Sequence, residues 1–76
     1  MNKVDEIHWG RGSAFNMGRI PECDVRIERV KDQNKKFYFL LSDASLTYLY
    51  CDSERYDTLK EMENAVLDWL RMKGRL

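Results

Sequence analysis

The last third of the chain carries the clearest hydrophobic pattern. Its apolar residues recur at steps of three and four, which is the spacing of one helix face. They are Leu59, Met62, Val66, Trp69 and Leu70. Thr58 and Glu61 have the spacing of a capping box at a helix start, and Gly74 is a typical residue just after a helix end. The pattern predicts a helix over residues 58–74 that buries one face.

Three segments upstream of this helix have the patterns of strands. Residues 24–30 alternate apolar and charged side chains, whereas residues 37–41 and 46–51 are rich in aromatic and branched residues. Polar stretches at 31–36 and 42–45 separate them and predict turns. The order of elements is therefore strand, strand, strand, helix.

The short turn at 42–45 predicts a register between the second and third strands. In that register Leu41 lies opposite Leu46, and Phe39 lies opposite Tyr48. The face that carries these side chains would be apolar, and the helix is expected to cover it. The predicted core consists of Val25, Ile27, Phe39, Leu41, Leu46, Tyr48, Leu59, Met62, Val66, Trp69 and Leu70.

The N-terminal segment has no regular pattern. Residues 1–9 are interpreted as a short strand or an arm, and residues 10–21 hold three of the four glycines and the only proline. Phe15 and Met17 are too apolar for a solvated linker. We therefore expect this segment to fold over the sheet face that the helix leaves open, as additional core.

These patterns give one fold prediction. A chain of 76 residues forms a single small domain, with residues 1–21 as an arm and residues 22–76 as the body. The predicted class is α+β: a three-stranded antiparallel sheet in β-β-β-α order, with one C-terminal helix packed on one face and an irregular N-terminal arm.

Composition restricts the classes of function. The chain has 13 basic and 13 acidic residues, so its formal net charge is zero, whereas a general polyanion binder normally has a basic excess. A local excess of basic residues along the sheet edge leaves nucleic-acid binding as the alternative function. The residues that would contact phosphates are Arg26, Arg29, Lys31, Lys35 and Lys36.

Residues 24–74 also resemble known small domains. The order of three strands and a helix, with Thr58-x-x-Glu61 ahead of Trp69, resembles the DNA-binding arm domains of some integrases. It is also similar to several short phage proteins that inhibit host enzymes. The integrase resemblance implies a basic sheet that reads DNA, but here Arg26 and Lys36 lie among acidic residues, Asp24 and Glu28, and apolar residues.

Residues able to carry catalysis are scarce. His8 is the only histidine and has no evident nucleophile or base as its partner in the sequence. Cys23 and Cys51 lack metal-ligand spacing and, in the predicted register, lie too far apart for a disulfide. The Gly-rich segment lacks the Gly-Lys-Ser/Thr end of a P-loop. We expect free thiols, no metal, no cofactor and no enzymatic activity.

The functional prediction is a small non-catalytic protein-binding module, of the kind that phages and mobile elements encode to inhibit or regulate a host protein. Aromatic and arginine side chains supply most interface energy, which points to Trp9, Arg11, Phe15 and Tyr38 as the contact residues. The competing interpretation is that the same residues only close the core or form a homodimer. No apolar run is long enough to span a bilayer and no signal peptide is evident, so we expect a cytoplasmic protein without membrane contacts.

Overall fold

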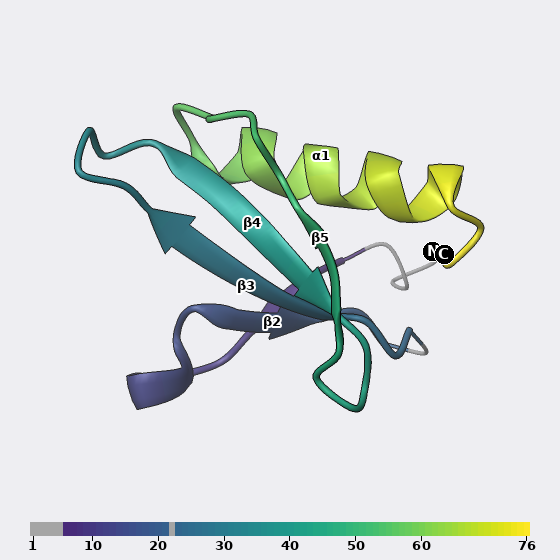
Figure 1. Ribbon diagram of the computed structural model, residues 1–76. Helices are drawn as coiled ribbons and strands as arrows, with labels where there is room; N and C mark the ends of the chain where they lie inside the picture. The colour runs from purple at the N-terminus through teal and green to yellow at the C-terminus, as the bar shows by residue number, and fades with distance from the viewer. Residues whose placement is uncertain (1–5, 22) are drawn as a thin grey trace.

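The structure is a computed structural model that describes residues 6–21 and 23–76. Within these residues five antiparallel strands form one sheet, and a single α-helix crosses one of its faces (Figure 1). The strands are β1 (His8–Trp9), β2 (Met17–Arg19), β3 (Arg26–Lys31), β4 (Phe37–Ser42) and β5 (Tyr48–Cys51). The helices are the short 3-10 helix η1 (Gly12–Ala14) and the α-helix α1 (Leu59–Met72). The first five residues of the predicted arm, and Glu22, lie outside the described residues.

The sheet has five strands, so the prediction of three is wrong. The Gly-rich arm supplies the two additional strands: Trp9 of β1 pairs with Gly18 of β2, and Gly18 pairs with Ile27 of β3. Strands of two and three residues are too short to show alternation in the sequence. The α+β class with one C-terminal helix is confirmed.

The position predicted for the arm is confirmed at Met17, which lies on the sheet face opposite α1, and is wrong for the arm residues that pack against the core. Ile7 and Trp9 pack against the core on the helix side of the sheet, and Ile20 is fully buried in that core. Extending the sheet pairs the backbone groups of the arm, which a loop lying across the sheet would leave unpaired. No helix or strand of the described residues packs over the face opposite α1, which we call the uncovered face.

The helix forms as its sequence predicts. The Thr58 hydroxyl accepts a hydrogen bond from the Glu61 amide, and the Glu61 carboxylate accepts one from the Thr58 amide, both at 3.2 Å. Gly74 adopts φ +70°, and the amide after it donates to the Leu70 carbonyl at 2.9 Å. A residue without a Cβ takes this left-handed conformation at little cost, which ends the helix.

The core lies between α1 and the middle of the sheet. Its fully buried residues are Ile20, Val25, Ile27, Phe39, Leu41, Met62, Val66 and Leu70. Leu59 and Trp69 are partly buried against them, and the Trp69 ring stacks on Tyr50 with ring centroids 5.0 Å apart. The predicted core positions Leu46 and Tyr48 are wrong, because these side chains are 68% and 63% exposed.

A register shift explains this error. Leu41 pairs with Tyr50 instead of Leu46, and Ser42 pairs with Tyr48, so β5 carries an extra residue between its two tyrosines. A bulge of this kind moves the side chains beyond it to the other face. Tyr50 therefore stays on the helix side, whereas Tyr48 lies on the uncovered face.

Candidate functional site

Trp9, a predicted contact residue, is built into the fold. It is half-buried on the helix side, where its indole nitrogen donates a 2.6 Å hydrogen bond to Glu63 of α1. A Cβ on Gly18 would lie 2.7 Å from the Trp9 ring, so the ring packs directly on the backbone of β2. Glycine at position 18 thus makes room for the tryptophan.

Phe15 and Trp9 both lie close to one cation. The Arg29 guanidinium is 4.7 Å from the centroid of the Trp9 ring and 5.4 Å from that of Phe15. Phe15 remains 57% exposed, and Arg29 is half-buried. Contacts of this type hold a guanidinium in place while its N–H groups remain able to donate.

Arg29 forms part of a groove along β3. The groove has a volume of about 510 Å³. It is lined by Phe15, Asn16, Glu28, Arg29, Val30, Lys31 and Phe37, and we call it the aromatic–cation groove. The Lys31 ammonium lies 5.3 Å from the centroid of the Phe37 ring. Two cations and two exposed or half-exposed rings therefore share one depression.

The other two predicted contact residues lie apart from this groove. Tyr38 is on the uncovered face, where the Arg55 guanidinium stacks 3.9 Å from the centroid of its ring. Arg55 also forms a 3.3 Å ion pair with Asp32. Arg11 is exposed at the start of η1. The structure thus brings Trp9 and Phe15 together and places Tyr38 on the opposite face.

The five basic residues proposed for nucleic-acid contacts are divided between the faces. Arg26 lies on the uncovered face, whereas Arg29 and Lys31 lie on the helix side. Lys36 forms an ion pair with Asp57, which raises the pKa of the lysine. Lys35 occupies the turn between β3 and β4. Only two of the five share one depression.

The turn between β3 and β4 is organised by Asp32. Its carboxylate accepts hydrogen bonds from the amides of Asn34 at 2.8 Å and Lys36 at 2.9 Å. The Lys36 bond is the main reason that the pKa of Asp32 lies below its ordinary value. The turn requires a left-handed residue, and Lys35 adopts φ +63°.

The turn between β4 and β5 has the same construction. The Asp43 carboxylate accepts from the amides of Ser45 at 2.9 Å and Thr47 at 2.8 Å. Here Leu46 is the left-handed residue, with φ +66°. A type I turn followed by one left-handed residue is a common hairpin connection, and glycine is favoured at the last position.

Leu46 and Tyr48 are part of an exposed apolar surface that sequence reasoning missed. They line a hollow of about 270 Å³ on the uncovered face. Its lining residues are Met17, Glu28, Leu40, Leu41, Ser42, Leu46 and Tyr48. We call Leu46, Tyr48 and this hollow the turn patch. The shared spacing of the two turns, an aspartate three residues before the left-handed position, was the signal that could have located it.

A buried carboxylate lies at the end of β5. Asp52 is 5% exposed, and its Oδ1 accepts from the Glu54 amide at 3.2 Å and from the Tyr50 hydroxyl at 3.4 Å. Burial, and then the neighbouring Asp52 carboxylate, raise the pKa values of Tyr50 and Tyr56. The arrangement keeps both phenols protonated and connects β5 to the loop before α1.

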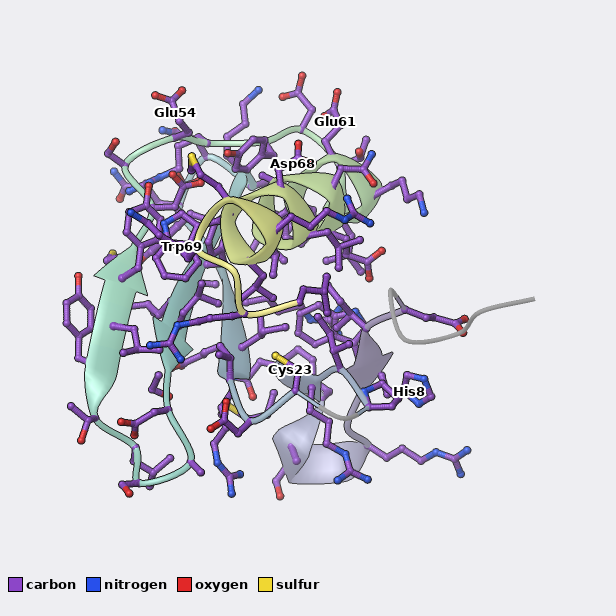
Figure 2. The ribbon with its side chains drawn as sticks, turned by 90° about the vertical axis from the view of Figure 1, so that its right-hand side faces the viewer. His8, Cys23, Glu54, Glu61, Asp68 and Trp69 are labelled. Atoms are coloured by element: carbon purple, nitrogen blue, oxygen red, sulfur yellow. The ribbon has the colours of Figure 1, made fainter. Side chains whose placement is uncertain are left out.

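His8 and the cysteines are not assembled into a chemical site. Figure 2 shows His8 at the opposite end of the molecule from Glu54. Cys23 and Cys51 are both free thiols, as predicted. Across residues 6–21 and 23–76, no group of three or more His, Cys, Asp or Glu side chains could hold a metal ion.

Comparisons with known proteins add no assignment. No protein-family model matches this chain, and neither a curated protein nor a solved structure does. Within the part of the chain that the structure describes, no helix is both long and apolar enough to cross a membrane.

Proposed function

We propose that this chain is a small non-catalytic protein-binding module and that the turn patch is its main contact surface. The observation that supports this most directly is Leu46, an exposed leucine held at φ +66°. A left-handed conformation costs a residue with a Cβ about 1–2 kcal/mol, and glycine would avoid most of that cost. The Leu46 side chain is 68% exposed, so its burial within the fold offsets little of that strain.

Exposed apolar surface at the same place supports the proposal. Tyr48 is nearly as exposed as Leu46, and both border a hollow whose lining includes Leu40 and Met17. A tyrosine and a leucine around an apolar depression form a surface that a protein partner can bury with good shape complementarity. Residues in strained backbone conformations cluster at functional sites.

The partner that fits this surface is a protein with an apolar site that accepts Leu46 and the Tyr48 ring. Binding by occupation needs no reacting groups. A chain that covers a partner's working surface would act as its inhibitor or regulator.

A pull-down from a lysate of the source organism tests this proposal. Leu46→Asn removes the apolar side chain and replaces it with a residue that tolerates φ > 0. Lys35→Asn makes the matching change in the other turn. We expect the wild-type chain and Lys35→Asn to recover the same stoichiometric partner, and Leu46→Asn and Tyr48→Ser to lose it while remaining folded by circular dichroism.

Two results would contradict the proposal. One is recovery of the same partner, in the same amount, by the Leu46→Asn chain. The other is a wild-type homodimer in light scattering that captures no other protein, since the patch would then serve self-association.

A further inference from the structure

The aromatic–cation groove is a second surface, which runs along the edge of β3 and shares Glu28 with the lining of the turn patch. We propose that it binds an acidic polypeptide segment in extended conformation, which adds to the open edge of β3. This site does not depend on the turn patch, so either one can fail in experiment without the other.

The first argument comes from the charges in the groove. Among the described residues, neither Arg29 nor Lys31 has a carboxylate within ion-pair distance, although both are close to aromatic rings. The carboxylate in the lining belongs to Glu28, which accepts a 3.5 Å hydrogen bond from Asn16. The groove therefore has a net positive charge and two cations held ready for anionic groups.

The spacing of these cations fits an extended chain. Arg29 and Lys31 are two residues apart on β3 and share one face, which separates their Cα atoms by roughly 6.6 Å. An extended peptide presents every second side chain on one face at the same interval. Carboxylates two residues apart on a peptide therefore match the two cations.

The second argument comes from the backbone of β3. The neighbouring strand β2 pairs as far as Glu28, and the last bond on this side runs from the Arg29 amide to the Asn16 carbonyl at 2.9 Å. The Asp32 amide bonds towards β4, so the alternation of the ladder points the Lys31 amide and carbonyl away from β4. Within the described residues no backbone group pairs with Lys31 on that side.

An open backbone position favours a peptide over a nucleic acid. A peptide can donate to and accept from Lys31 as an added strand, whereas an oligonucleotide has no matching repeat of donors and acceptors. Phe15 and Phe37 would contact an apolar side chain of the same peptide. Neutral net charge of the whole chain also disfavours a polyanion.

The test begins with a phage-displayed random heptapeptide library panned against the full chain. We expect recovered peptides to share two acidic residues separated by one residue. The binding of a fluorescein-labelled consensus peptide is then measured by fluorescence polarisation. Arg29→Met keeps an apolar stem near the rings, and Lys31→Met removes an exposed charge. Each should weaken binding by about tenfold or more, while Lys60→Met on α1 changes nothing.

Amide hydrogen exchange supplies an independent readout of the added strand. Saturating peptide should slow exchange at Lys31, which a purely electrostatic contact would not do. The proposal is overturned if the library yields no acidic consensus, or if the peptide binds Lys31→Met as tightly as the wild-type chain. It is also overturned if an octamer of deoxythymidine binds more tightly than the peptide and loses affinity in Arg29→Met. That result would identify the groove as a single-strand nucleic-acid site.

Discussion

The two faces of the sheet bury the side chains of one strand, β4, to different extents. On β4, Leu41 points towards α1 and is fully buried, while its neighbour Leu40 lies on the uncovered face and borders the turn patch. The helix face meets the requirement for a packed core. The uncovered face keeps apolar side chains that the fold itself does not bury, and those side chains are available to a partner.

The two hairpin turns repeat this contrast on a smaller scale. Asp32 and Asp43 impose one backbone geometry on both turns, so the left-handed position in each is set by the aspartate. One turn has Lys35 there and the other has Leu46. The side chain at this position is therefore not determined by the turn. The fold alone does not account for an exposed leucine there, whereas contact with a partner would.

The contrast between the faces predicts the largest difference in stability. Leu41→Ala should lower the free energy of unfolding by about 2–5 kcal/mol, because it leaves a cavity in the core. Leu40→Ala, one residue away, should cost at most about 1 kcal/mol because its side chain is half exposed. Urea denaturation of both variants measures the difference. Equal losses would mean that the uncovered face is packed in solution.

A somewhat smaller effect is expected where the arm joins the helix side. Gly18→Ala should destabilise the chain by about 1–3 kcal/mol, because the new Cβ would collide with the Trp9 ring. In the background of Trp9→Ala the same substitution should cost much less. A double-mutant cycle measures this coupling. Independent effects of the two substitutions would show that the ring does not lie on the strand.

The elements that could be predicted from the sequence are those with a long local pattern. The helix was predicted to within a residue or two at each end, because its cap residues and five apolar positions act together. The strand Phe37–Ser42 was predicted over residues 37–41, because its run of aromatic and branched residues favours a strand. A short strand was one of the two interpretations of residues 1–9, which include β1, whereas β2 was not predicted. Two or three residues carry no period, and the pairing of these strands depends on the contact between Trp9 and Gly18.

The face on which Tyr48 lies could not be predicted, because it follows from a single extra residue in β5. The bulge before Ser42 reverses the face of Tyr48 but leaves Tyr50 in place, and both are equally suited to a strand. Arg29 was named for phosphate contacts from its charge alone. Its position beside Trp9 and Phe15 depends on pairing between strands that are distant in sequence.

The helix side should also show a pH effect. Burial raises the pKa values of Tyr50 and Tyr56, so the folded chain holds these protons more tightly than the unfolded chain. The resulting stability is complete below the unfolded tyrosine pKa of about 10 and is lost as the pH rises above it. Thermal melts between pH 9 and 12 should show the fall, and Tyr56→Phe should reduce its slope. Identical slopes in both chains would contradict the burial of Tyr56.

The smallest expected change in stability separates the effect of Leu46 on the fold from its effect on binding. Leu46→Gly and Lys35→Gly should each raise the free energy of unfolding by roughly 0.5–1 kcal/mol, since glycine relieves the left-handed strain. Affinity for the partner recovered by the wild-type chain, measured by isothermal titration calorimetry, should fall by about tenfold or more in Leu46→Gly and stay unchanged in Lys35→Gly. A chain that gains stability and loses binding only at Leu46 would show that the leucine is kept for its partner. Unchanged affinity in Leu46→Gly would contradict the proposal that Leu46 is a contact residue for the partner.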